Sequence, residues 1–419
     1  MDATAFPDLL REFTYNGAPT LEVEESGLRY FINEYWTSSQ RQSHKLHEIS
    51  YRACFKPQLP GFFIDRLTRP GDTVYDPFSG RGTTVLQAAL SRCRPVGNDV
   101  NPLSEMLVRP RLAPVSLHAI ARRLAEIPTG QLPTGQLPAG ELPLGELPLG
   151  QLPLGEPADP GDELLVFYHP GTLRRLRGLR TWLLDRAAAG TLDATDRWIR
   201  MIALNRLTGH STGFFSVYTL PPNQAASIVS QRKINEKRGQ IPPLRDVDAI
   251  VMKKSRVLMA DGSPPPHPEA LLTSGPADNT PDIAAASVDV VVTSPPFLDI
   301  VDYEGDNWLR CWFAGIDPAT VKIDRHGNPA KWEAFVRRVF LELARIVRPG
   351  GTVAFEVGEV RGGKTLLERH VVNAIEGLPF ETMGVMVNQQ SFTKTANCWG
   401  VGNNTAGTNS NRIVLARRV

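Results

Sequence analysis

Two short motifs hold residue types whose spacing could carry chemistry, and the first is DPFSGRGTT at residues 76–84. Its glycines, Gly80 and Gly82, present no Cβ, so a ligand can approach the backbone closely. The motif has no GK[ST] to hold phosphates and magnesium, and it is not GxGxxG. Asp76 could accept a hydrogen bond from a cationic amine, and Asp99 ends the next expected strand, where an acid can bind ribose hydroxyls. The pattern predicts a site for a nucleotide-like ligand.

The second motif is TSPPF at residues 293–297, directly after an apolar run. Two prolines in succession fix the chain and leave carbonyl oxygens without a neighbouring amide. The Ser294 hydroxyl and the Pro295 carbonyl could hold the two hydrogens of an aryl amine, and Phe297 offers a flat face for stacking a base. A plain strand-ending turn is the alternative for this motif alone. Its pairing with the first motif favours an amine site.

The segments around the motifs indicate the elements that must position them. Residues 72–78 and 95–99 form short apolar runs typical of strands, and residues 83–92 have apolar side chains at helical spacing. The expected order is a strand, a glycine-rich turn, a helix and a second strand that ends in an acid. This order is typical of a nucleotide-binding half of a doubly wound sheet. Further along, 286–297 holds a buried strand, 332–351 an amphipathic helix that ends in a Pro-Gly-Gly stop, and 352–358 another strand. We predict an α/β fold with a doubly wound, mostly parallel sheet.

The end of the chain has a different pattern. Residues 383–393 and 411–418 predict an antiparallel strand pair around a loop rich in Gly and Asn. The run 388–412 is polar and rich in hydroxyls, which indicates either a DNA-facing loop or an ordered surface hairpin.

Composition divides the chain into four parts. Residues 1–111 form the expected cofactor half, 112–160 a flexible linker, 161–262 a basic and mainly helical region, and 263–419 the half with TSPPF. The linker contains five tandem G-[QE]-L-P-x pentapeptides over residues 130–154. A proline at every fifth position denies a helix its amide donors, so we expect no helix there. A partner-docking strip is the weaker alternative, because of the leucines.

The charge of the chain is uneven, and the basic region indicates a polyanionic partner. Its residues 161–260 carry 16 Lys and Arg against 8 Asp and Glu, whereas the whole chain carries only +2. This pattern fits a polyanion docking at one place, although a solvated helix face explains charge equally well. The candidate DNA contacts are four cations and two aromatic residues that could instead be core: Arg232, Lys233, Lys237, Arg238, Phe214 and Phe215.

Several classes of protein are disfavoured. The cysteines form no CxxC pair, and the histidines make no ligand pattern, so no metal is expected. His44 and His47 are read as packing or phosphate contacts. No apolar stretch approaches the ~18 residues of a membrane helix, and the N-terminus lacks a signal-peptide pattern, so a soluble intracellular protein is expected.

The two motifs together resemble those of the amino-methyltransferase family of DNA modification enzymes, which methylate cytosine N4 or adenine N6. The resemblance implies a class I methyltransferase fold, Rossmann-like, with S-adenosylmethionine as cofactor. The upstream cofactor motif of the family is matched by Tyr51, Ala53, Phe55 and Pro57, and its acid near the adenine ring by Asp278. The cofactor turn is matched by Asp76, Pro77, Phe78, Gly80, Gly82 and Thr83, followed by Asp99. The catalytic motif is matched by Ser294, Pro295, Pro296 and Phe297.

The resemblance also narrows the reaction. Members with Ser in the catalytic motif are mostly N4-cytosine enzymes, so Ser294 favours N4 methylation of a flipped cytosine by direct transfer. The order of motifs places recognition of double-stranded DNA between about Pro160 and Gly262, and a cognate restriction endonuclease is a possible partner. The resemblance also implies a cytoplasmic, nucleoid-associated location in a prokaryote. Three alternatives stay open: an N6-adenine enzyme, an RNA or protein methyltransferase of the same fold, and a non-catalytic DNA-binding module.

Overall fold

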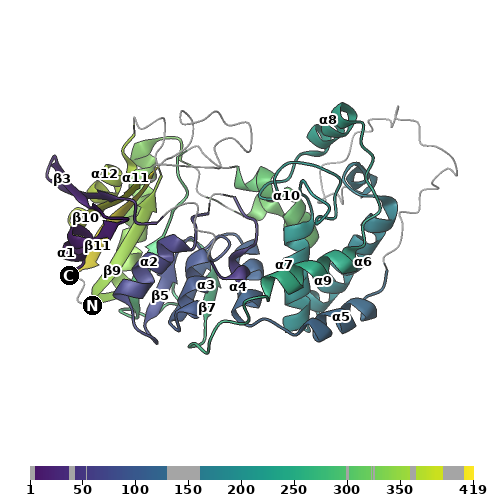
Figure 1. Cartoon of the computed structure of the whole chain (residues 1–419), viewed down its shortest axis with the longest axis horizontal. Coiled ribbons are helices and arrows are strands. Elements are labelled where there is room, and N and C mark those ends of the chain that lie inside the picture. The colour runs from purple at the N-terminus through teal and green to yellow at the C-terminus, as the bar shows by residue number, and fades with distance from the viewer. Residues whose placement is uncertain are drawn as a thin grey trace. The chain divides into compact units, whose positions relative to one another are not determined.

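A computed structural model describes residues 5–36, 43–52, 54–129, 161–298, 302–321, 323, 326–358, 365–389 and 410–419. The chain forms two compact units, which are described separately (Figure 1). Unit 1 comprises residues 1–114, 257–303 and 321–419, and unit 2 comprises residues 115–256 and 304–320.

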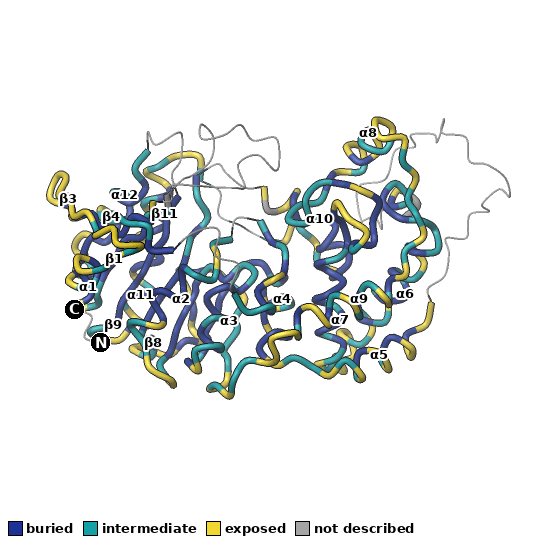
Figure 2. Tube along the Cα trace, viewed as in Figure 1, coloured by how far each residue is buried: buried dark blue, intermediate teal, exposed yellow. Residues whose placement is uncertain are grey.

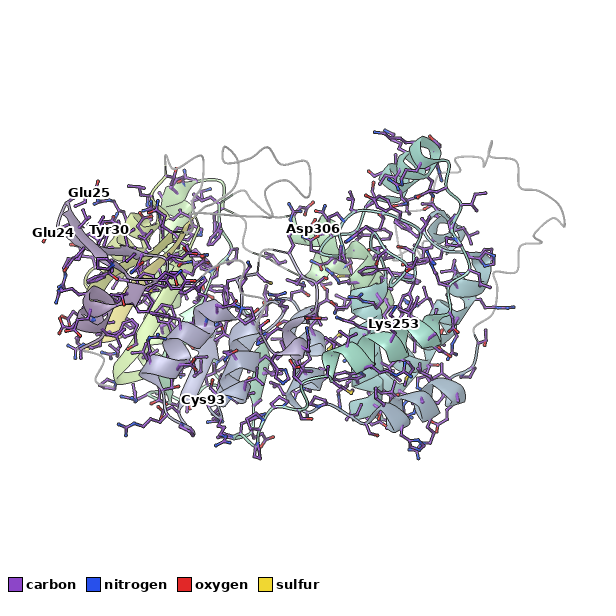
Figure 3. The ribbon with its side chains drawn as sticks, in the orientation of Figure 1. Glu24, Glu25, Tyr30, Cys93, Lys253 and Asp306 are labelled. Atoms are coloured by element: carbon purple, nitrogen blue, oxygen red, sulfur yellow. The ribbon has the colours of Figure 1, made fainter. Side chains whose placement is uncertain are left out.

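Unit 1 is built on a nine-stranded sheet in the order β3-β4-β10-β11-β9-β8-β5-β6-β7. The strands are β3 (Leu21–Glu25), β4 (Leu28–Asn33), β5 (Thr73–Asp76), β6 (Arg94–Asp99), β7 (Leu271–Ser274), β8 (Val288–Thr293), β9 (Val347–Val357), β10 (Phe380–Gln389) and β11 (Ser410–Arg418). The neighbours β7, β6, β5, β8 and β9 run parallel, and β11 is antiparallel to both β9 and β10. β3 and β4 form an edge hairpin that carries Glu24, Glu25 and Tyr30 (Figure 3).

Helices cover both faces of this sheet, as the buried β5 and β8 require. The helices of unit 1 are α1 (Phe6–Glu12), α2 (Gln58–Leu67), α3 (Thr83–Leu90), α4 (Leu103–Leu112), α11 (Pro329–Ile346) and α12 (Leu367–Ile375). On one face, Trp332 and Phe340 of α11 pack with alternate residues of β9 such as Phe355. On the other, Phe62 of α2 packs with Ala354 and its neighbours. The predicted doubly wound, mostly parallel α/β fold is confirmed.

Unit 2 is mainly helical. Its helices are α5 (Leu117–Glu126), α6 (Pro170–Ala188), α7 (Ala194–Arg206), α8 (Ile228–Arg238), α9 (Val247–Leu258) and α10 (Tyr303–Ala314). A buried acid ties three of them together: Asp196 of α7 is fully buried and pairs with Arg123 of α5 and, at 2.7 Å, with Arg186 of α6. A small two-stranded sheet, β1 (Thr14–Tyr15) and β2 (Ala18–Pro19), and the 3₁₀ turns η2 (Lys45–His47), η3 (Gly161–Val166) and η4 (Pro318–Thr320) complete the described elements.

One detail of the expected organisation is wrong. Residues 117–126 are not linker but the helix α5, whose Ile120 and Leu124 are buried. The amphipathic helix expected to stop at the Pro-Gly-Gly of residues 349–351 is confirmed: it ends at Ile346, and the Pro-Gly-Gly segment lies in β9. Proline lacks an amide donor and Gly350 has φ 79°, so the backbone leaves the helix before them. The pentapeptides at 130–154 lie outside the described residues.

The glycine turn between β5 and α3 depends on close packing at Gly82. Its φ is 73°, in the left-handed region, and a Cβ built there would lie 2.2 Å from Val108 Cγ2 of α4. Gly80 likewise has φ 51°. The turn can therefore sit against α4 only because residue 82 has no side chain.

We predict that Gly82→Ala destabilises unit 1 by about 2–4 kcal/mol, the sum of left-handed strain and overpacking against Val108. Gly27→Ala is the matched control, because Gly27 has φ 74° and a Cβ added to it would meet no atom within 4 Å. We expect Gly27→Ala to lower the free energy of unfolding by about 1–2 kcal/mol, which is the strain of a left-handed alanine alone. Chemical denaturation measures both variants, and equal losses would contradict the packing account.

Candidate active site

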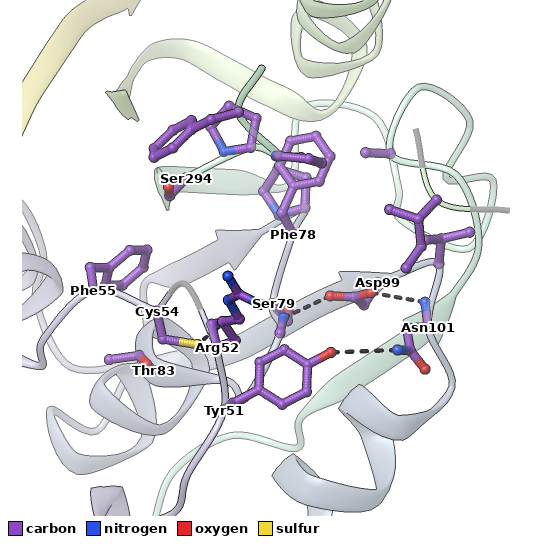
Figure 4. A pocket seen from close by; sticks show the side chains of 18 of the residues that line it. Tyr51, Arg52, Cys54, Phe55, Phe78, Ser79, Thr83, Asp99, Asn101 and Ser294 are labelled. Carbon is purple, nitrogen blue, oxygen red and sulfur yellow. Dashed lines mark hydrogen bonds between the residues drawn. The ribbon is translucent and has the colours of Figure 1, made fainter. Parts of the chain in front are cut away.

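One cavity of unit 1 brings the two sequence motifs together at the carboxyl ends of the parallel strands (Figure 4). Its volume is about 940 Å³, including space open to solvent. It is lined by Tyr51, Arg52, Cys54, Phe55, Pro77, Phe78, Ser79, Gly80, Thr83, Asp99, Val100, Asn101, Gly275, Pro276, Ala277, Ser294, Pro295, Pro296, Phe297 and Ile323. The position is the one where doubly wound sheets bind ligands.

Asp99 lines the cavity and holds the backbone of the glycine turn and of Asn101 through hydrogen bonds. One of its oxygens accepts from Gly80 N at 2.7 Å and the other from Asn101 N at 2.8 Å. Asn101 Nδ2 donates to the Tyr51 hydroxyl at 3.4 Å (Figure 4). Burial raises the pKa of Asp99 to about 6, while the two backbone amides lower it. Each carboxylate oxygen has a further lone pair, so Asp99 can still accept from hydroxyl groups of a ligand.

Asp76 lies at the end of β5, 1% exposed, and is not among the residues that line the cavity. Its Oδ1 accepts from Thr293 Oγ1 of β8 at 2.6 Å and from Phe78 N at 3.1 Å. Burial raises the pKa of Asp76 to about 7, and the hydrogen bond from Thr293 lowers it. The carboxyl therefore joins the two motifs, and its expected contact with a cofactor amine stays a prediction.

The segment Ser294–Phe297 leaves β8 and is held from several sides. Trp332 Nε1 of α11 donates to the Pro296 carbonyl at 2.8 Å. Phe297 packs so closely on Gly358 that a Cβ there would lie 2.7 Å from its ring. The Ser294 hydroxyl hydrogen-bonds to Glu356 of β9. The backbone after Thr293 thus has little freedom, and Ser294 faces the cavity that Asp99 lines.

Two arginines hold the upstream segment against the glycine turn. Arg81 donates to the carbonyls of Ile49 and Phe55 at 2.9 and 3.2 Å. Arg111 of α4, fully buried, donates to the carbonyls of Leu107, Leu46 and Arg81. Because these guanidinium groups bond to backbone oxygens, they fix segment and turn together. Burial, reinforced by Arg81, lowers the pKa of Arg111 to about 9.

Most of the sequence-predicted site residues lie together in this cavity. They are Tyr51, Phe55, Pro77, Phe78, Gly80, Thr83, Asp99, Ser294, Pro295, Pro296 and Phe297. Gly82 belongs to the glycine turn but does not line the cavity, and it packs against Val108 of α4. Asp278 also lies outside the lining and pairs with Arg338 at 2.8 Å. The contact expected between Asp278 and the adenine ring of a cofactor stays a prediction, and the neighbouring residues 275–277 line the cavity. Ala53 lies outside the described residues.

Sequence reasoning missed the third strand end of the site. Gly275, Pro276 and Ala277 directly follow β7, which pairs with β6 beside Asp99. The signal was the run LLTSGP, four strand-forming residues before a Gly-Pro turn. Arg52, Cys54 and Asn101 were also missed, because they neighbour the motifs without belonging to them.

The expected DNA contacts in unit 2 divide into two groups. Arg232, Lys233, Lys237 and Arg238 are exposed on α8, which Figure 2 shows as mostly exposed. Phe214 and Phe215 are only 5% and 0% exposed and belong to the interior of unit 2. These two phenylalanines are therefore not retained as DNA contacts, because neither ring presents a face to solvent.

Helix α8 is attached to unit 2 by amide side chains, and Gln231 is its one buried residue. Gln231 Nε2 donates to the Tyr218 carbonyl at 3.0 Å, and Asn235 Nδ2 donates to the Val166 carbonyl at 2.7 Å. Arg238 lies over the Tyr218 ring at 3.8 Å. This attachment leaves most of the helix surface, with its cations, free for contact.

Over the described residues, no group of His, Cys, Asp and Glu could hold a metal ion. His47 is buried, contacts Gln87, and burial lowers its pKa well below the usual value. No described helix is both long and apolar enough to cross a bilayer.

Comparison with known proteins gives a family match in the N-terminal part of unit 1. Residues 11–103 match the model of the N6/N4 DNA methylase family, described as "DNA methylase". The type II methyltransferase M.MvaI of Kocuria varians is 28% identical over 100 residues, which cover 23% of this chain and 21% of that protein. M.MjaII of Methanocaldococcus jannaschii is 28% identical over 91 residues, covering 22% and 17%. The chain thus matches about a fifth of the length of these relatives.

Solved structures are similar only at a distance. A putative DNA modification methylase from Thermus thermophilus, complexed with S-adenosyl-L-methionine, is 23% identical with a TM-score of 0.20, over 32% of this chain and 49% of that one. The rRNA methyltransferase aviRa from Streptomyces viridochromogenes is 13% identical with a TM-score of 0.31, over 89% of both chains. Because these scores are low, the assignment of the fold rests on the strand order of the sheet. The matched DNA methylase family uses S-adenosylmethionine.

The raised pKa of Asp76 predicts a specific pH dependence of stability. Its pKa is about 7 in the folded protein against an ordinary value of 3.8, so the folded state binds the proton more tightly. The stabilisation from this protonation is present at low pH and is lost as the pH rises to about 7. His47, which is buried and neutral, makes the stability of the fold change with pH in the opposite direction. The test is therefore the difference in stability between the wild type and a variant at position 76.

We expect Asp76→Asn to gain stability relative to the wild type as the pH rises between about 4 and 7. Thermal unfolding of the unliganded proteins across this range measures the difference. Glu342→Gln is the control, because hydrogen bonds from Arg345 and Thr280 hold the pKa of Glu342 at about 2, outside the window. A difference between wild type and Asp76→Asn that stays constant over the window would contradict the assignment.

Proposed function

We propose that this protein is an S-adenosylmethionine-dependent DNA methyltransferase that methylates the N4 amine of a cytosine turned out of the duplex. The observation that carries the proposal is that Ser294, Pro295 and Phe297 line the same cavity as Gly80 and Asp99. A cofactor site and an amine site that share one cavity can bring a methyl donor and an acceptor into reach. The family match of residues 11–103 supports a DNA methylase and is equally compatible with cytosine N4 and adenine N6.

The cavity fits the cofactor chemically. Asp99 offers acceptor lone pairs for a ribose diol, and the Gly80 turn lets a ligand lie against the backbone. Phe78, Pro276 and Ala277 provide apolar surface for a flat base ring. S-adenosylmethionine, when bound, supplies an electrophilic methyl group.

The TSPPF segment fits an aryl amine. The Ser294 hydroxyl and the Pro295 carbonyl are neutral acceptors for the two amine hydrogens, so the nitrogen lone pair is directed at the methyl donor. Phe297 provides a ring face for the target base. The work of the protein is orientation and charge stabilisation, and no side chain needs to form a covalent intermediate.

The choice of cytosine over adenine rests on Ser294. The resemblance to family members with Ser at this position favours N4 of cytosine, whereas N6-adenine enzymes usually carry Asp or Asn. A serine offers one neutral oxygen, which is sufficient to accept one amine hydrogen. Adenine N6 is the second candidate.

Duplex DNA is the proposed partner, and α8 of unit 2 is its proposed contact. The helix carries four exposed cations, and amide side chains attach it to the unit. Lys and Arg side chains in such a position neutralise phosphates and set orientation on the duplex.

The experiment that tests the function is transfer of a radiolabelled methyl group to unmethylated duplex DNA, to RNA and to protein. Label in DNA alone supports the proposal, and label confined to RNA or protein, or none at all, contradicts it.

For the amine site, we expect Ser294→Ala to lower kcat by about 10²-fold or more, since an acceptor of the amine hydrogen is lost. The Kd for S-adenosylmethionine, measured by calorimetry, should stay within about twofold, because Ser294 does not touch the proposed ribose site. Cys311→Ser, at a buried thiol of unit 2, is a control for mutation away from the cavity. Equal losses in kcat and in cofactor affinity would contradict the role of Ser294.

For the DNA contact, we expect the triple variant R232A/K233A/K237A to weaken duplex binding at least tenfold at moderate salt. The slope of the logarithm of the binding constant against the logarithm of salt concentration should become shallower by about 3. The matched variant R174A/K253A/R256A removes three exposed cations from α6 and α9 of the same unit. Fluorescence anisotropy over a salt series measures both. If the two triples lose affinity equally, α8 has no special role and only net charge matters.

A further inference from the structure

A row of polar side chains, of which Glu356 and Asn388 are buried, crosses the sheet of unit 1 and ends at Ser294. Its members are Ser294 after β8, Glu356 of β9, Asn411 of β11 and Asn388 of β10, four strands that are neighbours in the sheet. The pairing of Thr293 with Phe355 puts Ser294 beside Glu356. Asn411 Nδ2 donates to Glu356 Oε1 at 3.0 Å. The row therefore connects the amine site to the middle of the sheet.

The strand periodicity places the row on one face. Alternate residues Val292 and Ala354 precede Ser294 and Glu356 by two and belong to the core on the α1–α2 face. Ile413 and Met386 stand in the same relation to Asn411 and Asn388. Side chains two apart on a strand point to the same side, so these polar groups continue rows of apolar ones.

Glu356 is unusual in this setting. It is 5% exposed, and the nearby Arg412, which follows Asn411, pairs with Glu368 and not with Glu356. Its hydrogen-bond partners are Ser294 and Asn411, both neutral. Burial raises the pKa of Glu356, and the bonds to these two residues lower it. Burying a carboxyl among neutral partners costs folding free energy, so a functional reason for Glu356 is expected.

The hydrogen-bonding capacities of the row supply that reason. Asn411 Nδ2 is a donor and approaches Glu356, so the amide presents hydrogen to the carboxyl. A carboxylate is acceptor-only, so the remaining partner, Ser294, must donate its single hydroxyl hydrogen. With that hydrogen committed to Glu356, Ser294 Oγ has only lone pairs to offer the cavity. An amine needs such an acceptor there.

We propose that Glu356 is a positioning residue for methyl transfer: it holds the Ser294 hydroxyl hydrogen away from the cavity, so that Oγ accepts a hydrogen of the target amine. This inference rests on the proposed function. Asn411 fixes the orientation of the carboxyl, and Asn388, whose Oδ1 accepts from Tyr35 N at 2.8 Å, closes the row.

The same arrangement gives the departing proton a path. During transfer the N–C bond forms while the C–S bond breaks, with both of its electrons staying on sulfur, and the amine nitrogen becomes cationic. The nitrogen then passes a proton to Ser294 Oγ as Ser294 passes its hydroxyl proton to Glu356. One N–H bond and one O–H bond break and two O–H bonds form, so charge balances with Glu356 neutral at the end.

Glu356→Gln tests the proposal because it reverses the direction of the hydrogen bonds. Asn411 still donates, so the new amide at position 356 must turn its carbonyl oxygen to Asn411 and its NH₂ group to Ser294. Ser294 Oγ then accepts from that NH₂ group and turns its own hydrogen to the cavity. We expect kcat to fall about 10²-fold, with KM for DNA and Kd for S-adenosylmethionine within about threefold of the wild type.

The double variant E356Q/N411D should restore activity in part. The carboxylate introduced at position 411 accepts from the NH₂ group of the amide at position 356, whose carbonyl oxygen then faces Ser294. The Ser294 hydroxyl is oriented as in the wild type, but the amide at position 356 cannot take the proton that Glu356 takes. We therefore expect kcat to recover at least tenfold over E356Q without reaching the wild-type value. Glu368→Gln is the matched control: Glu368 is 1% exposed and bonds Arg412 at 2.6 Å, yet it does not contact Ser294. It reports what loss of a buried carboxylate does to stability and kcat.

The outcomes separate the role of Glu356 from the proposed function. A kcat of E356Q equal to that of E368Q, or no recovery in the double variant, overturns the role of Glu356 while wild-type methyl transfer to DNA still stands. If E356Q does not fold, the double variant decides: kcat within about tenfold of the wild type supports the proposal, and a folded, cofactor-binding double variant with a loss of about 10²-fold overturns it. Absence of wild-type transfer to DNA overturns the proposed function itself.

Discussion

The hydrogen bond from Thr293 to Asp76 joins the carboxyl ends of β8 and β5, and the rest of the site depends on the pairing of these two strands. The residues are 217 positions apart in the chain. Because both strands are central and run parallel, their ends open at the same edge of the sheet, with the glycine turn on one side and Ser294 on the other. The bond buries a carboxyl that would otherwise be costly, and so makes the register of the two motifs specific.

Around that bond, the protein uses buried polar groups to hold backbone instead of relying on apolar packing alone. Asp99 ties the glycine turn to Asn101, and Arg81 and Arg111 tie the upstream segment to the same turn. Each group is satisfied by backbone partners, so the cavity wall is rigid where a ligand must be oriented. Rigid placement of this kind is what direct methyl transfer requires, since its catalysis comes mainly from geometry and charge.

The fold and most of the cavity lining could be predicted from the sequence, because DPFSGRGTT and TSPPF are local patterns that mark strand ends. What could not be predicted depends on pairing across the sheet. Gly275–Ala277 joined the cavity through β7, and Glu356 reached Ser294 through the β8–β9 register, neither of which is visible in a linear motif. Phe214 and Phe215 were misassigned by composition, since aromatic residues near cations look the same in sequence whether buried or exposed.

The most direct test of the proposed function is the nucleoside composition of DNA methylated by the protein. Unmethylated genomic DNA would be incubated with S-adenosylmethionine and either the wild type or the Ser294→Ala variant, digested to nucleosides and analysed by mass spectrometry. We predict N4-methyldeoxycytidine with the wild type and almost none with the variant. N6-methyldeoxyadenosine in its place would contradict the assignment of the base, and the absence of any methylated nucleoside would contradict the proposed function.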